Sequence, residues 1–446
     1  MFYKIIYFYA LSNIFISIRN VGLIVRSVKM QVIADLGGTP GKDCRGFCKF
    51  CYFRKVKPLT EALGCQHCPP NKVGCPRCLE GVQEAGKPFQ QPFSVISEVQ
   101  MALMMNPVRD ANLKVNISGG GDVSCYPYLE ELISNLSQMQ LPIHLGYTSG
   151  KGIDDGDIAT QFLNQGVDEV TYTIFAADPK LRKEWMLDPS PEESLKAAQL
   201  FAEGADLHAA AVIIPGVNDG AVLQNTCEKL EEWGAKALMM MRFANSYDQG
   251  LILGNEPVVE GIVPHEPLEF EELVKQINSE YNLRVTGTPL SDPTIGAPFI
   301  LAKDEYEEFL GILPQVTGEA TLLTSKIAAP FLKKIFDKIA PDNVNVVATK
   351  KDIACLMTKQ DLEVLDLDDI KDAVILPGRA FIHQLDAERI LSQDGKSRLV
   401  GYGPDTLSVD GELSSGMSEE EVIEHELGSF IDLIQAINFF GMRRVS

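Results

Sequence analysis

Positive charge is scarce in this sequence: 40 Lys and Arg residues face 61 Asp and Glu residues, which gives a net charge near −21. Nucleic-acid binding needs clustered basic side chains that displace phosphate counterions, so this balance argues against a nucleic-acid partner. A basic partner, or a substrate that presents Arg or Lys, is easier to accommodate. The sequence also lacks low-complexity tracts, and 45% of its residues are hydrophobic, as is typical of a folded globular chain.

Long apolar segments are equally scarce, and the most apolar one lies at the amino terminus. Residues 5–18 are mostly aliphatic and aromatic, but this stretch is too short for a transmembrane span. No clear small-residue cleavage site follows it, as a secretory signal would require. A second methionine, Met30, stands directly before a strand-like run. We therefore expect residues 1–29 to be a non-native or dispensable extension, and we expect no membrane association.

Cysteine is sparse over most of the chain, because seven of the ten cysteines fall between residues 44 and 78. They stand in close pairs, and in a chain of 446 residues such pairs indicate metal ligation rather than a disulfide framework. Metal-bound thiolates need a reducing compartment, so we expect a cytoplasmic protein.

Apolar β-rich runs alternate with amphipathic helical stretches from Met30 to about residue 290. Continuous apolar strands that alternate with helices favour a parallel sheet with helices outside. Six such units predict an α/β fold, a partial (β/α)6 barrel, whose chemistry sits at the carboxyl ends of the strands. The expected strands are 32–36, 113–118, 143–147, 169–175, 207–214 and 237–243, and the expected helices are 95–105, 128–139, 158–165, 191–203, 221–233 and 268–281.

The rhythm changes after about residue 290, where a turn-rich stretch leads into shorter, mixed elements. The expected elements there are helices 328–339 and 419–436 and strands 344–348 and 373–376. We therefore expect two domains. Residues 30–290 would form the barrel, with 52–92 as an inserted loop, and residues 291–446 would form a C-terminal α+β domain.

The loop after the first expected strand carries Cys44, Cys48 and Cys51 in the spacing C-x-x-x-C-x-x-C. A [4Fe–4S] cluster normally takes four thiolates, so three on one short loop leave one iron open to another ligand. The spacing, with the aromatic Phe50 before the third cysteine, resembles that of the radical SAM superfamily. In that superfamily S-adenosylmethionine (SAM) chelates the open iron. A zinc site, or part of a four-cysteine knuckle, is the alternative for these cysteines.

The second expected strand ends in a glycine-rich turn made of Ser118, Gly119, Gly120, Gly121 and Asp122. Glycines let the backbone approach a ligand closely. The turn resembles the Gly-Gly-Glu motif of the superfamily with Asp in place of Glu, which makes Asp122 a candidate to receive the SAM ammonium group. An ordinary turn is the plainer interpretation.

Two other strand ends carry candidate residues. Ile214 ends the fifth expected strand in a segment that resembles the superfamily's region near the SAM adenine. Tyr147 ends the third strand, where a phenol can face the cluster. The plainer interpretations are an ordinary βα turn and a tyrosine on the barrel rim.

A second cysteine group consists of two C-x-x-C pairs: Cys65 with Cys68, and Cys75 with Cys78. Four thiolates at this short spacing can enclose one tetrahedral ion, either zinc or rubredoxin-like iron. A further [4Fe–4S] cluster and disulfides are the alternatives. Four protein ligands leave no open position on a single ion, so we interpret this site as structural.

Both cysteine groups, the Gly-Gly-Gly-Asp turn and the C-terminal domain resemble the methanogenesis marker protein ten family from Met30 to the C-terminus. That family is the radical SAM methyltransferase that methylates an arginine in the α subunit of methyl-coenzyme M reductase. The resemblance implies cobalamin, held mainly by the C-terminal domain, iron in the four-cysteine loop and Tyr147 as a transient cluster ligand. It also implies an arginine segment of that subunit as the substrate and an electron donor as a partner.

The sequence departs from common cobalamin-binding modules, because it contains no Asp-x-His-x-x-Gly motif. The residues alone therefore do not show cobalamin. The function we expect is cobalamin-dependent methylation of an sp³ carbon of arginine. A radical SAM enzyme that modifies peptides or proteins without cobalamin, and a non-catalytic metal-thiolate scaffold, are the alternatives.

Overall fold

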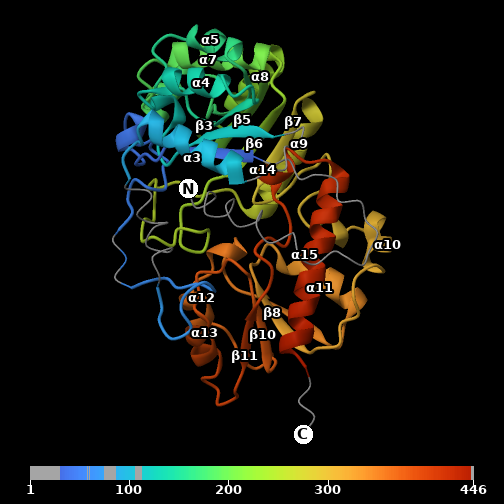
Figure 1. Cartoon of the computed structure of the whole chain (residues 1–446). Coiled ribbons are helices and arrows are strands. Elements are labelled where there is room, and N and C mark those ends of the chain that lie inside the picture. The colour runs from blue at the N-terminus through green and yellow to red at the C-terminus, as the bar shows by residue number, and fades with distance from the viewer. Residues whose placement is uncertain (1–30, 58, 60, 75–86, 106–112, 443–446) are drawn as a thin grey trace.

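The computed structural model describes residues 31–57, 59, 61–74, 87–105 and 113–442, and it contains two parallel β-sheets (Figure 1). The expected N-terminal extension with Met30, and the cysteines Cys75 and Cys78, lie outside the described residues. The first sheet has seven strands and the second has four. The α/β fold class expected from the sequence is confirmed.

All seven strands of the first sheet are parallel and stand side by side in sequence order. They are β1 (Gln31–Asp35), β2 (Lys114–Ser118), β3 (Ile143–Thr148), β4 (Val167–Thr173), β5 (Asp206–Ile213), β6 (Ala237–Arg242) and β7 (Arg284–Thr288). The first six match the six expected strands, and β7 is one strand more than expected. Among the residues that the structure describes, no pairing joins β1 to β7, so the sheet is open there.

The helices between residues 92 and 280 pack on one face of the first sheet and share a single apolar core with it. They are α3 (Pro92–Met105), α4 (Leu129–Ser137), α5 (Ile158–Asn164), α7 (Pro191–Gly204), α8 (Gly220–Trp233) and α9 (Pro267–Glu280). A short helix, α6 (Pro179–Leu181), continues into a π-helical turn at Arg182–Met186. Consecutive parallel strands with helices on one face are the arrangement of an open β/α barrel, so the functional side chains are sought at the carboxyl ends of the strands.

The second sheet has the strand order β11-β10-β8-β9, and its strands are again parallel. They are β8 (Ala320–Thr324), β9 (Val344–Ala348), β10 (Ala373–Leu376) and β11 (Leu399–Tyr402). This arrangement differs from the expected α+β domain, because parallel strands need helical crossovers and therefore alternate with helices. The short strands β8 and β11 were not among the expected elements.

Helices cover both faces of the second sheet. One face packs against α11 (Ala329–Ile339) and the long α15 (Glu419–Phe440), and the other packs against α12 (Lys359–Glu363) and α13 (Gln384–Leu391). The chain runs from β8 to β9 on one side and then returns to β10 on the other side. The carboxyl ends of β8 and β10 therefore form the switch point at which open α/β sheets bind ligands.

The loops at the carboxyl ends of the two sheets meet. Arg242, the last residue of β6, forms a buried ion pair of 2.6 Å with Asp352, which follows β9. The loop after β11 returns to the first sheet and forms α14 (Gly411–Ser414), which lies beside it in Figure 1. A Cβ on Gly411 would come within 2.4 Å of the Gly287 carbonyl oxygen, so only glycine allows this contact between α14 and β7. Among the described residues, no helix is long and apolar enough to cross a membrane.

Candidate functional site

Cys44, Cys48 and Cys51 lie on the loop that follows β1, and their thiols are close enough to interact electrostatically. Asp43 holds the loop in shape, since its carboxylate accepts a hydrogen bond of 2.7 Å from the Thr39 amide. Gly41 has a positive φ of 80°, and a Cβ there would collide with the Phe47 ring. The backbone geometry thus places the three cysteines together at the carboxyl edge of the first sheet.

When no metal is bound, burial disfavours the deprotonated thiolate form of the three cysteines. It raises the pKa of Cys44 to about 11 and that of Cys48 to about 12, and it also raises the pKa of Cys51. A bound metal stabilises the thiolate form and deprotonates such ligands outright. The donor set therefore fits a cationic iron centre.

In the part of the chain that the structure describes, no three His, Cys, Asp or Glu side chains are arranged around a single ion. The thiolates of a [4Fe–4S] cluster bind separate irons, so its cysteines need not converge on one point. Three neighbouring thiols on one loop are compatible with that arrangement.

An apolar wall backs the cysteine loop. The Phe50 ring stacks on Phe175 with 4.8 Å between ring centroids, and both rings are buried. Ile214, the residue expected near the adenine, is fully buried in the same cluster. The Cys48 thiol donates to the carbonyl oxygen of Met186 at 3.6 Å. This wall shields one side of the cysteines from water.

The glycine-rich turn after β2 packs directly on the cysteine loop. Its first residue, Ser118, pairs with Asp35 of β1, and the Gly120 amide donates to the Gly37 carbonyl at 2.6 Å. A Cβ on Gly119 or Gly121 would come within 3 Å of backbone carbonyl oxygens of the neighbouring loop. The glycines are thus required for this close approach, while their contact with SAM stays a prediction.

Asp122 is buried and joins two strand ends. Its carboxylate accepts hydrogen bonds from the Ser124 amide and hydroxyl, at 2.9 and 2.7 Å, and from the Ser149 amide and hydroxyl. The carboxylate therefore connects the β2 and β3 loops. The proposed contact between Asp122 and the SAM ammonium group stays a prediction.

Sequence reasoning missed a buried cation at this edge. Lys151 is 1% exposed, and its ammonium group donates to the Gly46 carbonyl oxygen at 2.6 Å, inside the cysteine loop. Its positive charge acts on Cys48 and Cys51 and partly offsets the effect of burial on their pKa values. The signal in the sequence was a lysine between two glycines directly after β3.

Tyr147 lies near the end of β3 and is 40% exposed, and its hydroxyl donates to Oε1 of Glu412 on α14. Burial and the nearby Asp410 raise the pKa of Glu412 to about 7. The structure thus joins the predicted cluster-facing tyrosine to a carboxylate from the other half of the chain. A bond between Tyr147 and cluster iron stays a prediction.

The loop with Cys65 and Cys68 contacts the carboxyl edge of the second sheet. The Gln66 amide donates to the Gly378 carbonyl after β10, at 2.6 Å, and to the Asp405 carboxylate after β11, at 2.7 Å. The Cys68 sulfur accepts a hydrogen bond of 3.3 Å from the Gly74 amide. Because Cys75 and Cys78 lie outside the described residues, the four-thiolate metal site stays a prediction.

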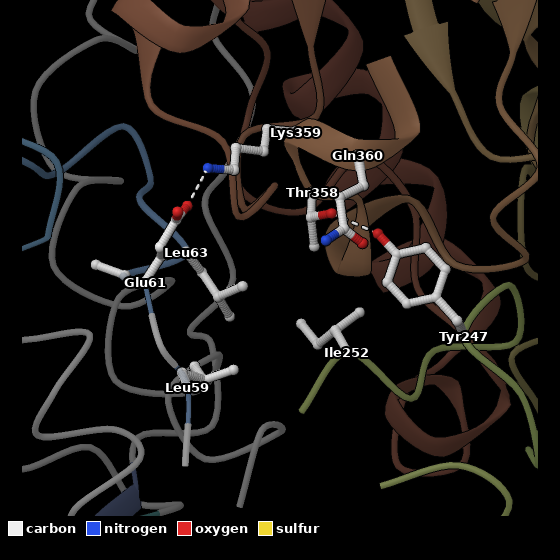
Figure 2. A pocket seen from close by; sticks show the side chains of 9 residues that line it. Leu59, Glu61, Leu63, Tyr247, Ile252, Thr358, Lys359 and Gln360 are labelled. Atoms are coloured by element: carbon white, nitrogen blue, oxygen red, sulfur yellow. Dashed lines mark hydrogen bonds and ion pairs between the residues drawn. The ribbon is translucent and has the colours of Figure 1, made fainter. Parts of the chain in front are cut away.

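A cavity of about 280 Å³ lies beside this loop (Figure 2). It is bounded by the segment before Cys65, by the loop after β6 and by the start of α12. Lys359 forms an ion pair with Glu61 at 2.5 Å, and the hydroxyls of Tyr247 and Thr358 are also 2.5 Å apart. These contacts join the loop before Cys65 and the loop after β6 to the start of α12 beside the second sheet.

Residues 39–225 match the family model of the radical SAM superfamily. This match covers the cysteine loop, the glycine-rich turn and strands β2 to β5. This part of the chain is therefore similar to the radical SAM superfamily. No curated protein matches the sequence significantly.

Similar solved structures include three proteins with low sequence identity. SuiB from Streptococcus suis has 13% identity and a TM-score of 0.38, over 58% of this chain and 50% of that one. A radical SAM methyltransferase from Sphaerobacter thermophilus has 12% identity and a TM-score of 0.36, over 58% and 65%. TsrM from Kitasatospora setae, a radical SAM methyltransferase solved with cobalamin and a [4Fe–4S] cluster, has 14% identity and a TM-score of 0.29, over 40% and 32%. The aligned region thus spans about half of SuiB and a third of TsrM.

Proposed function

We propose that this protein is a cobalamin-dependent radical SAM enzyme that methylates an sp³ carbon of an arginine in the α subunit of methyl-coenzyme M reductase. The observation that carries the radical SAM part is the placement of Cys44, Cys48 and Cys51 together at the carboxyl end of β1. The superfamily match over residues 39–225 supports it. The choice of arginine and cobalamin rests on the family resemblance of the sequence.

The residues of the first sheet have separate tasks in this proposal. When bound, SAM on the cluster supplies a carbon-centred radical that removes hydrogen from an unactivated carbon, and methylcobalamin supplies the methyl group. The three cysteines hold the cluster, and Lys151 places a positive charge beside them. The Phe50–Phe175 wall keeps water away from one side of the cysteine loop.

Two unpaired donors at the switch point of the second sheet support a further ligand there. Arg379 follows β10, and its Nε and one terminal nitrogen are buried without a hydrogen-bond partner among the described residues. Buried donors are normally paired, so these two point to acceptor atoms supplied from outside the chain. Cobalamin carries amide carbonyls and a phosphate that can serve as those acceptors. We therefore place cobalamin at this edge, which faces the loops of the first sheet.

His383, which follows β10, already has partners. His383 donates through Nε2 to the Pro69 carbonyl at 2.9 Å, and its Nδ1 accepts from the Leu385 amide at 3.2 Å. It is therefore not proposed as the lower cobalt ligand. This agrees with the lack of the Asp-x-His-x-x-Gly motif in the sequence.

Anaerobic reconstitution with iron, sulfide and hydroxocobalamin tests this proposal. We expect the washed protein to retain cluster iron and sulfide together with stoichiometric cobalamin, measured by its absorption spectrum. Arg379→Met should weaken cobalamin retention on the order of tenfold, because it removes charged donors, while cluster absorption stays unchanged. A protein that binds the cluster and cleaves SAM but never retains cobalamin would favour a cobalamin-free peptide-modifying enzyme. A protein that binds neither would favour a metal-thiolate scaffold.

A further inference from the structure

At the junction between α14 and the first sheet, only one oxygen of the Glu412 carboxylate has a hydrogen-bond partner among the described residues. Glu412 Oε1 accepts a hydrogen bond from the Tyr147 hydroxyl. Its other oxygen, Oε2, is buried and has no hydrogen-bond partner in the described part of the chain. Leaving a buried acceptor unpaired is costly, so such an atom marks a place where a donor from outside is expected.

Among the described residues, no cation forms an ion pair with the two carboxylates of this junction, Asp410 and Glu412. Asp410 lies close to Glu412, but its oxygens are already used, by the amides of Glu412 and Leu413 and by the Thr288 hydroxyl at 2.6 Å. Arg284 is the basic residue of β7, and it pairs with Asp292 at 2.8 Å instead.

Two fully buried hydroxyls at the same junction are also unpartnered. Thr286 and Ser414 are 0% exposed, and neither hydroxyl has a hydrogen-bond partner in the residues that the structure describes. Thr286 lies on the face of β7 shared with Arg284 and Thr288, both of which bond to the segment around α14. The junction therefore contains hydrogen-bonding groups that the described residues leave unpaired.

These features match the chemistry of one ligand group, a guanidinium. Its planar fork of donors binds carboxylates, and its flat face stacks on aromatic rings. The junction offers a carboxylate oxygen without a donor and, beside it, the 40% exposed ring of Tyr147. A lysine ammonium has neither the fork nor the flat face. A neutral side chain would leave the charge of Glu412 uncompensated.

We infer that Glu412 is a specificity-determining residue that binds the guanidinium group of the substrate arginine. The inference rests on the proposed function, and it adds the residue by which an arginine is selected. Glu412 belongs to the second half of the chain, whereas the cluster cysteines belong to the first. Substrate selection thus depends on the docking of α14 onto β7.

Binding measurements with the anaerobic holoenzyme test this inference. The probes are fluorescent peptides that cover each arginine of the methyl-coenzyme M reductase α subunit, and the same peptides with citrulline, which has a similar shape and no charge. We expect the wild-type protein to bind the best arginine peptide about 10- to 100-fold more tightly than its citrulline counterpart. Glu412→Gln keeps the size of the side chain and should remove most of this preference.

The matched control is Glu426→Gln on α15. Glu426 is also fully buried, but its carboxylate has donors, the Ser408 hydroxyl and the Leu301 amide at 3.1 Å. This variant should keep the wild-type preference for arginine. Cluster absorption and thermal unfolding establish that both variants are folded.

The outcomes separate the inference from the proposed function. If wild-type protein binds an arginine peptide but prefers it no more than the citrulline peptide, the inference is overturned without recourse to any variant. If Glu412→Gln retains the preference, the inference alone is overturned. If wild-type protein binds none of the peptides, the proposed substrate fails, and the inference fails with it.

Discussion

Replacement of Cys44, Cys48 and Cys51 by alanine is expected to abolish both the [4Fe–4S] cluster and the formation of 5′-deoxyadenosine from SAM. The three thiols supply every protein ligand that we assign to the cluster, and iron is not retained without thiolate ligands. SAM cleavage should therefore fall to the background of a protein-free reaction. Iron and sulfide analysis, with chromatographic detection of 5′-deoxyadenosine, measures the two losses separately.

Cys125→Ala is the matched control for this triple variant. Cys125 lies near Cys44 and Asp122, and burial raises the pKa of its thiol as it does for the cluster cysteines. It stands outside the C-x-x-x-C-x-x-C motif, so its loss should leave cluster content and SAM cleavage close to wild type. Normal SAM cleavage by the triple variant would refute the assignment of the cluster ligands.

The second large effect is expected on stability, at Arg182. This guanidinium is fully buried and donates to Asp188 Oδ2 at 2.7 and 3.0 Å, and to the carbonyl oxygens of Thr173, Ile174 and Ser149. Arg182→Met would leave the Asp188 carboxylate buried without its counter-charge, with hydrogen bonds from the Ser190 amide and the Ser194 hydroxyl still in place. Breaking a buried ion pair in this way costs about 3–5 kcal/mol of the free energy of unfolding.

Urea unfolding followed by tryptophan fluorescence measures this loss. Both tryptophans, Trp185 and Trp233, belong to helical segments around the first sheet, so the signal reports on the half that contains Arg182. Lys196→Met removes an exposed ion pair with Asp157 and serves as the control, with no measurable change expected. An Arg182→Met protein as stable as wild type would show that its hydrogen bonds are replaced by water or by other groups.

The first sheet could be predicted from the sequence because its signals are local. Each of β1 to β6 contains at least two β-branched or aliphatic residues, and the expected bounds differ from the observed ones by at most two residues. The cysteine motif was equally readable, since its three cysteines lie within eight consecutive residues. Strand β7 was missed because its five residues, which include a glycine, carry too few apolar side chains to stand out from the turns that follow.

The partners of the site residues could not be predicted, because they depend on contacts between distant segments. Glu412 reaches Tyr147 across 265 positions, and it does so from a four-residue helix with no recognisable pattern of its own. Arg182 looks like a surface residue in the sequence, yet a π-helical turn directs it inward to Asp188. Lys151 is likewise buried, and its ammonium group contacts the distant cysteine loop at Gly46.

The second sheet illustrates the same limit on a larger scale. Its strands have only four or five residues, a length that carries little periodic signal, and although β9 and β10 were predicted with their observed bounds, the equally short β8 and β11 were missed. The parallel order of the four strands depends on long-range pairing. The sequence therefore predicted a mixed α+β domain where the structure has a doubly wound sheet. That difference matters for the proposed cobalamin site, because only the parallel order creates the switch point beside Arg379.

The most direct test of the central claim is the fate of the SAM methyl group. The reconstituted holoenzyme would be incubated under reducing conditions with SAM that carries a deuterated methyl group, cobalamin and arginine peptides of the methyl-coenzyme M reductase α subunit. We predict that one deuterated methyl group appears on a side-chain carbon of an arginine, located by fragmentation mass spectrometry, only when cobalamin is present and together with 5′-deoxyadenosine. A methyl group on a guanidinium nitrogen, or 5′-deoxyadenosine formation with no methylated arginine in any peptide, would contradict the account.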